Sequence, residues 1–125
     1  MIKGKDVVVH FSKEANEAYT QLQEKVANQR KQGTQNSSDM QLLKSIDREK
    51  ENLKRDPQSG IHIPRANIPK QAVQRYGTDK LWKINLAGYW RMIYTITGND
   101  VEIITFVLEI MDHKDYDKVF GYKKK

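Results

Sequence analysis

Three apolar stretches follow one another late in the chain, and this succession constrains the fold more than any other feature. They cover residues 81–86, 89–97 and 101–108, and each is rich in β-branched or aromatic side chains, which is typical of strands. The breaks between them, residues 87–88 and 98–100, are long enough only for hairpin turns. We therefore predict a three-stranded antiparallel meander.

The first half of the chain predicts one strand followed by two helices. Residues 7–11 are β-branched and aromatic, and Ser12 then stands at the N-cap of a helix. Ser38 and Gln41 have the spacing of a capping box, so a second helix is expected from there until it ends near Arg55, just before Pro57. The first helix has an apolar stripe made of Ala15, Ala18, Tyr19, Leu22 and Val26.

The order of these elements predicts an α+β fold, in which the N-terminal strand and an αα-hairpin pack on one face of the antiparallel β-meander. The other face would then be free to bind a ligand. We expect residues 61–80 to form an ordered connection with one helical turn near residues 71–76, and residues 112–121 to form a short helix or an edge segment. The length of 125 residues fits a single domain, 1–125, with residues 121–125 as a frayed tail.

Charge and composition narrow the functional classes. The 22 Lys and Arg residues exceed the 16 Asp and Glu residues, which gives a formal charge of +6 and favours polyanionic or acidic partners. The absence of cysteine excludes disulfides, thiol catalysis and cysteine-ligated zinc. No apolar run approaches the length of a membrane span, and we expect a cytoplasmic protein without a signal peptide.

Basic and aromatic residues alternate between residues 61 and 96. Cations together with aromatic rings are typical of a surface that binds single-stranded RNA. The same residues have structural explanations, since aromatic residues in a meander also form cores and exposed cations also form solvated faces. The cations are Arg65, Lys70, Arg75, Lys80, Lys83 and Arg91, against the single acid Asp79, and the aromatic residues are Tyr76, Trp82, Tyr89, Trp90 and Tyr94.

Two residues stand where chemistry could occur. Arg91 lies in the middle of a predicted strand, where its charge needs either a structural carboxylate or a bound phosphate. His113 follows the last apolar stretch, at a position that is fixed by the strand and yet open to solvent, and histidine can both give and take a proton near neutral pH. The three histidines lack the spacing of a metal site, so no metal or cofactor is expected.

The layout resembles the RelE/ParE toxin superfamily, the toxin halves of bacterial and archaeal toxin–antitoxin pairs. The similarity lies in residues 81–86 (LWKINL), 90–94 (WRMIY) and 106–111, which run into 113–116 (HKDY) and Val119-Phe120. The resemblance implies a ribosome-dependent endoribonuclease of the RelE branch, an mRNA interferase that uses no metal and attacks the adjacent phosphate with a ribose 2′-OH. It also implies a cognate antitoxin as partner.

The resemblance also implies roles for individual residues. Arg91 matches the arginine that contacts the phosphate, Lys83 a basic residue on the preceding strand, and His113 a candidate acid or base. Asn85 stands where some members have a second lysine, and Phe120 stands at the usual final tyrosine, which leaves Tyr116 or Tyr122 to replace it. The expected RNA-binding residues are Arg65, Lys70, Arg75, Lys80, Trp82 and Tyr122.

Three other functions remain open at this point. A ParE-like toxin would bind DNA gyrase and would need neither His113 nor a catalytic tyrosine. A pure RNA-binding module would keep the basic, aromatic surface but would not depend on His113. A catalytically degenerate toxin would retain only its antitoxin partner.

Overall fold

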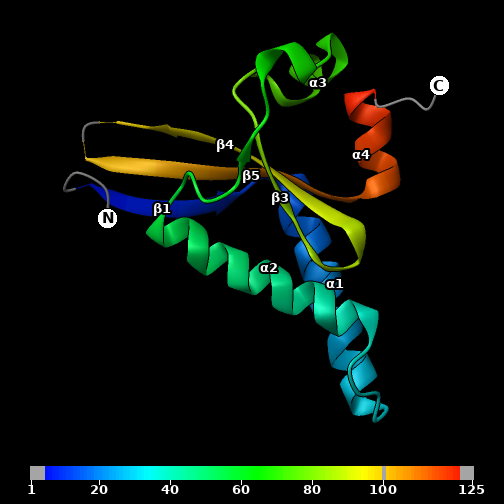
Figure 1. Ribbon diagram of the computed structural model, residues 1–125. Coiled ribbons are helices and arrows are strands. Elements are labelled where there is room, and N and C mark those ends of the chain that lie inside the picture. Colours follow the sequence, from blue (N-terminus) through cyan, green and yellow to red (C-terminus); the bar gives the residue numbers. More distant parts are fainter. Residues whose placement is uncertain (1–4, 100, 122–125) are drawn as a thin grey trace.

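The computed structural model describes residues 5–99 and 101–121, and Figure 1 shows its elements in chain order. They are β1 (Asp6–Phe11), α1 (Lys13–Lys31), α2 (Ser38–Arg55), β2 (Ile61–His62), the 3-10 turn η1 (Arg65–Asn67), α3 (Lys70–Tyr76), β3 (Trp82–Asn85), the 3-10 turn η2 (Ala87–Tyr89), β4 (Trp90–Gly98), β5 (Glu102–Asp112) and α4 (His113–Phe120). The predicted α+β class is confirmed.

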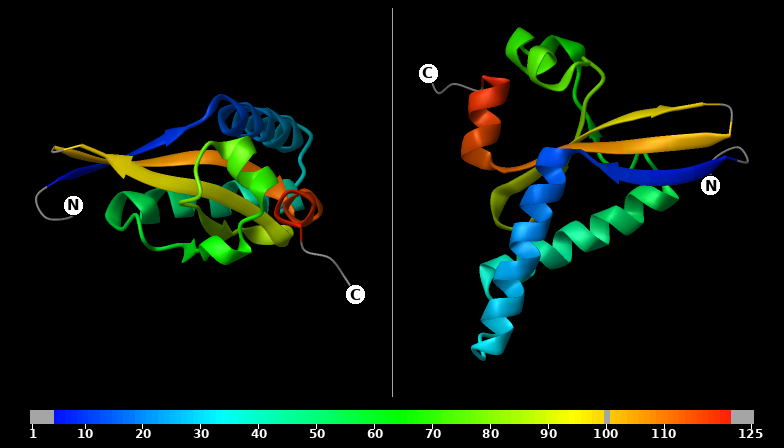
Figure 2. Two further views of the ribbon diagram at one scale, coloured as in Figure 1. Left: turned by 90° about the horizontal axis from the view of Figure 1, so that it is seen from above. Right: turned by 180° about the vertical axis from the view of Figure 1, so that it is seen from behind.

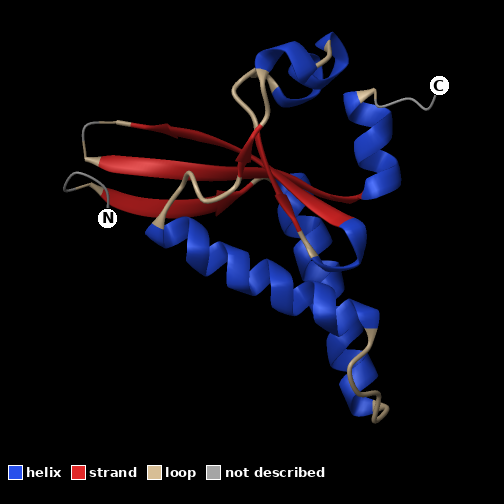
Figure 3. Cartoon of the chain, viewed as in Figure 1, coloured by secondary structure: helices blue, strands red, loops and turns tan. Residues whose placement is uncertain are grey.

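The sheet has five strands in the order β1-β5-β4-β3-β2. The predicted meander is present as the antiparallel pairs β3–β4 and β4–β5, and β1 pairs with β5 in parallel, with Asp6 opposite Glu102. The fifth strand, β2, lies in the segment that the sequence predicts as an ordered connection with one helical turn, so that prediction was incomplete. Figure 3 shows the strands in red between two groups of helices.

One face of the sheet is covered by the helical hairpin, as predicted. The buried stripes of α1 and α2, which include Leu22, Val26 and Ile46, pack with Met92, Tyr94 and Val107 of the sheet. Ser12 forms the predicted N-cap of α1, since its hydroxyl accepts a hydrogen bond from the Ala15 amide at 3.0 Å. Seen from behind in Figure 2, the tip of the hairpin projects away from the sheet.

The cap of α2 differs from the prediction by one residue. Ser37, and not Ser38, accepts the hydrogen bond from the Met40 amide at 3.1 Å, and it donates one to Gln29 of α1 at 2.5 Å. Gln41 reaches back to Asn36 instead of closing a box with Ser38. Only Ser38 has a glutamine three residues later, whereas Ser37 has Met40 there, so the capping-box motif indicated the wrong one of two adjacent serines.

The opposite face of the sheet is not free, contrary to the prediction. A second apolar cluster lies there between the sheet and the segment η1–α3 with α4, and it includes Ile68, Ala72, Ile93, Met111 and Phe120. Figure 1 shows α3 and α4 on the side of the sheet that faces away from α1 and α2. The helix α4 confirms a short helix, and not an edge segment, for residues 112–121. Tyr122 and the rest of the expected tail, apart from Gly121, lie outside the described residues.

Candidate active site

Two cations from neighbouring strands meet on the face that carries α3 and α4. Lys83 of β3 pairs with Ile93 of β4, and Asn85 pairs with Arg91, so Lys83 and Arg91 point to the same side because paired residues share a face of the sheet. Both side chains approach the ring of Tyr116 in α4: the Lys83 Nζ lies 5.1 Å and the Arg91 Cζ 5.6 Å from its centroid. Cations are attracted to an aromatic face at such distances, so Tyr116 fixes the place of both.

Neither cation has an acidic partner among the residues that the structure describes. The ion pairs there involve other residues, and the Arg91 guanidinium has one hydrogen bond, from Nη1 to the Trp90 carbonyl at 3.3 Å. The Arg91 Nε is buried and has no hydrogen-bond partner within the described residues. A buried donor without an acceptor is costly. Of the two sequence-based alternatives for Arg91, this geometry favours a site for an incoming anion over a structural ion pair.

His113 lies at the same end of the sheet as Arg91. In the β4–β5 ladder Arg91 is opposite Met111 and Trp90 is opposite Asp112, and His113 follows as the first residue of α4. Asp112 caps this helix by accepting a hydrogen bond from the Asp115 amide at 2.9 Å. The imidazole of His113 is exposed and contacts the ring of Tyr89 edge to face, with 5.8 Å between the centroids. The site therefore has a solvent-accessible group that can transfer protons beside a pair of cations.

The fold around this site is found in a solved structure. A YoeB/ParE toxin from Agrobacterium tumefaciens superimposes with a TM-score of 0.54, and the match covers 85% of this chain and 98% of that chain at 16% sequence identity. This chain has a RelE/ParE-like toxin fold. No protein-family model matches the sequence, and no curated protein matches it.

Within this RelE/ParE-like fold, Tyr116 occupies the floor of the site. Its side chain is 2% exposed and stacks on Phe120 with 4.5 Å between the ring centroids. The ring lies under Lys83 and Arg91, so the residue orients both cations whatever its hydroxyl contributes. Its predicted part in proton transfer stays a prediction.

Two of the arginines expected to bind RNA are engaged in ion pairs. Arg65 of η1 contacts Asp79 with 2.9 Å between Nε and Oδ2. Arg75 of α3 makes a bidentate pair with Glu109 of β5, at 2.8 and 2.6 Å. Its hydrogen bond to Glu109 raises the Arg75 pKa further above its usual high value. Both cations already have a carboxylate, so neither resembles the unpaired cations at Tyr116.

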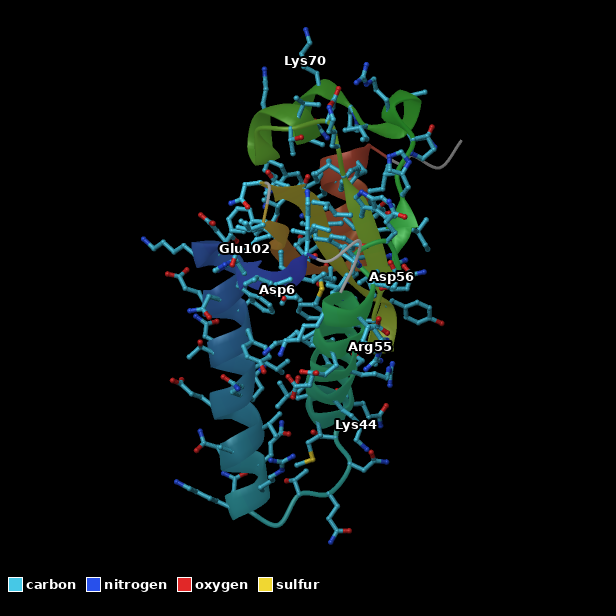
Figure 4. All side chains as sticks on the ribbon, turned by 90° about the vertical axis from the view of Figure 1, so that its left-hand side faces the viewer. Asp6, Lys44, Arg55, Asp56, Lys70 and Glu102 are labelled. Atoms are coloured by element: carbon cyan, nitrogen blue, oxygen red, sulfur yellow. The ribbon has the colours of Figure 1, made fainter. Side chains whose placement is uncertain are left out.

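The other expected RNA-binding residues lie apart from this pair. Trp82 points to the opposite face of the sheet, where it stacks on Tyr94 with 6.0 Å between the centroids. Lys70 and Lys80 are exposed, and Figure 4 shows Lys70 at the end of the molecule opposite the tip of the hairpin. The structure thus brings Lys83 and Arg91 together on the ring of Tyr116, with His113 at the same end of the sheet, and Arg65, Lys70, Arg75, Lys80 and Trp82 are not part of this cluster.

Glu109 is a residue that the sequence analysis missed. Besides Arg75 it accepts a hydrogen bond from the Tyr76 hydroxyl at 2.7 Å, and burial together with this bond raises the Tyr76 pKa well above its ordinary value. A sequence signal existed, because Glu109 is an acid between the apolar residues Leu108 and Ile110, directly after a predicted strand, and so needs a cation if it is buried. Residues 5–99 and 101–121 contain no group of three or more His, Cys, Asp or Glu side chains that could hold a metal ion, and no helix there is long and apolar enough to cross a membrane.

Proposed function

We infer that the protein is the toxin of a toxin–antitoxin pair and that it cleaves mRNA on the ribosome, with a cognate antitoxin to neutralise it. The observation that carries this proposal is the cation pair Lys83 and Arg91, which contact one aromatic ring and have no acidic partner among the described residues, at the end of the sheet where the exposed His113 lies. The RelE/ParE-like fold supports a toxin, and the chemistry of the cation pair favours a phosphate over a protein target.

Each residue has a defined task in this proposal. The ribose 2′-oxygen attacks the adjacent phosphorus, the bond from phosphorus to the 5′-oxygen breaks, and negative charge builds on the non-bridging phosphate oxygens. Lys83 and Arg91 bind these oxygens, and because they are already oriented by Tyr116 they stabilise the developing charge without rearrangement. His113 transfers one of the two protons, either from the 2′-hydroxyl or to the departing oxygen.

The proposal is tested by cleavage of ribosome-bound mRNA. Arg91→Ala or Lys83→Ala should each lower the rate about 100- to 1,000-fold, as the loss of one oriented donor does. His113→Ala should lower it about 100- to 10,000-fold, as the loss of one acid or base does. Lys44→Ala is the matched control, because Lys44 is an exposed lysine of α2, on the hairpin side of the sheet. Circular dichroism melts would verify that each variant is folded.

Three results would overturn the proposal. If Arg91→Ala and His113→Ala remain folded and cleave like the parent protein, the site is wrong. If expression arrests growth with intact mRNA and altered DNA supercoiling, the target is gyrase, as expected of a ParE-like toxin. Harmless expression in the absence of an antitoxin would support a catalytically degenerate toxin instead.

A further inference from the structure

Tyr89 differs from the other aromatic residues that alternate with cations in this region. Its side chain is 73% exposed, whereas Tyr76, Trp82 and Trp90 are half-buried and Tyr94 is fully buried. Exposing a large ring to water gives up the free energy that its burial would provide. An isolated exposed ring is common on protein surfaces, so its position relative to the cations decides whether it has a role.

The backbone at Tyr89 is also in an unfavourable conformation. Its φ angle is +65°, in the left-handed region that non-glycine residues seldom adopt, and Gly88 before it has a φ of +69°. A glycine at position 89 would adopt this conformation without strain. The chain therefore carries a tyrosine, with its ring in solvent, at a place where the backbone favours glycine.

The turn that carries Tyr89 is held rigidly. The Leu86 amide donates to the Trp90 carbonyl at 2.8 Å, and the Ala87 amide donates to the hydroxyl of Ser45 in α2 at 3.2 Å. Ser45 itself is 2% exposed and donates to the Leu42 carbonyl at 2.8 Å. The ring thus projects from a turn that is fixed to the buried side of α2, and its position is set before any ligand arrives.

The ring lies at the end of the sheet where the cation pair and the histidine meet. Tyr89 directly precedes β4, two residues before Arg91, and its ring contacts the imidazole of His113 edge to face. We propose that Tyr89 is the stacking site for the nucleobase next to the phosphate that Lys83 and Arg91 bind. Single-stranded nucleic acids are commonly bound in this way, with backbone phosphates on cations and bases on aromatic faces.

This inference rests on the proposed function, because it needs an RNA phosphate at Lys83 and Arg91. The inference adds a residue that contacts a base of the RNA, while Lys83 and Arg91 contact the RNA backbone. Since every base has a π-face, stacking on Tyr89 would accept all four bases and favour the purines, whose faces are larger. The contact between the two rings also places His113 beside the stacked nucleotide.

Binding of a short single-stranded RNA, 2′-O-methylated so that it is not cleaved, tests the inference. Tyr89→Gly should weaken binding about 5- to 150-fold, as the loss of one stacked base does, and should not lower the melting temperature because glycine suits the backbone there. Tyr89→Phe should bind like the parent protein. Val101→Ala is the control, since Val101 is 69% exposed at the far end of the β4–β5 hairpin.

A double-mutant cycle with RNAs that each lack one base identifies the stacked nucleotide. At one position, removal of the base should weaken RNA binding to the parent protein but should not weaken binding to Tyr89→Gly any further. The stacking role is wrong if, at every position, removal of the base weakens binding equally for the parent and for Tyr89→Gly. It is also wrong if Tyr89→Gly binds RNA like the parent while Lys83→Ala binds weakly. In both cases the proposed function stands. If the parent does not bind, or Lys83→Ala binds equally well, both fail together.

Discussion

We expect Arg75 and Arg91, which lie on the same side of the sheet, to respond in opposite ways to replacement by glutamine. Arg75 makes a bidentate pair with Glu109, and the two side chains are 49% and 17% exposed. Arg91 has no carboxylate partner among the described residues. Arg75→Gln should therefore reduce the stability of the fold, and Arg91→Gln should reduce the activity.

The expected losses of stability and of cleavage rate follow from the burial and geometry of the two arginines. Exposed ion pairs contribute about 0.2–1 kcal/mol, whereas breaking a fully buried pair costs about 3–5 kcal/mol. Glu109 lies between these limits and keeps its bond from Tyr76, so we expect Arg75→Gln to cost about 1–2 kcal/mol with an unchanged cleavage rate. Arg91→Gln should lose the long hydrogen bond to the Trp90 carbonyl and its contact with the Tyr116 ring, the latter about 0.5–1 kcal/mol, while cleavage falls about 100- to 1,000-fold.

Urea denaturation gives the stability of each variant, and cleavage of ribosome-bound mRNA gives its activity. The two measurements on two variants yield a crossed pattern that neither a general loss of charge nor a general loss of folding would produce. The reasoning is refuted if Arg91→Gln unfolds as readily as Arg75→Gln while still cleaving, because Arg91 would then be the structural residue.

Three further results are expected. Affinity for RNA or ribosomes should fall as salt concentration rises, because cations bound to phosphates displace counterions, and a salt-independent affinity would argue against a nucleic-acid partner. The stability of the fold should decrease as pH rises from about 10 to 12. Burial raises the pKa of both Tyr19 and Tyr94 to about 12, and at Tyr19 the hydrogen bond to Asp47 raises it as well. Because the folded state favours the neutral phenols, it is destabilised where they ionise. The decrease should be shallower in Tyr94→Phe when urea denaturation is followed against pH. Finally, Ser45→Ala should cost about 1–3 kcal/mol, because the Ala87 amide loses its acceptor, and a melting curve like the parent's would contradict this.

Local patterns in the sequence were sufficient to predict most of the fold. The period of two in residues 90–94 alone separates Arg91 and Ile93 from Met92 and Tyr94, and the structure has these two pairs on opposite faces of the sheet. The strand β2 escaped prediction because two residues have no periodicity, and its place depends on pairing with β3. It is also fixed by Tyr94, whose hydroxyl donates to the Pro57 carbonyl at 2.8 Å and accepts from the Gly60 amide at 3.1 Å.

The site was predictable only where chain order determines position. Arg91 lies near the start of β4 and His113 directly follows β5, so the hairpin that joins these strands places both residues at one end of the sheet. The support of Lys83 and Arg91 by Tyr116 depends on how α4 turns back over the sheet, and the partnership of Arg75 with Glu109 joins residues 34 positions apart. Such contacts are set by tertiary packing, and the local sequence does not identify the partner of each residue.

The parallel pairing of β1 with β5 determines when the sheet can close during synthesis of the chain. β5 lies between β1 and β4, and it also anchors the start of α1 through the hydrogen bond from the Ser12 hydroxyl to the Leu108 carbonyl, a contact across 96 positions. Until β5 leaves the ribosome, a nascent chain has no partner for β1 and no strand that leads to His113. The sheet can therefore close around β5, and the start of α1 can be anchored to it, only after residues 102–112 have been synthesised.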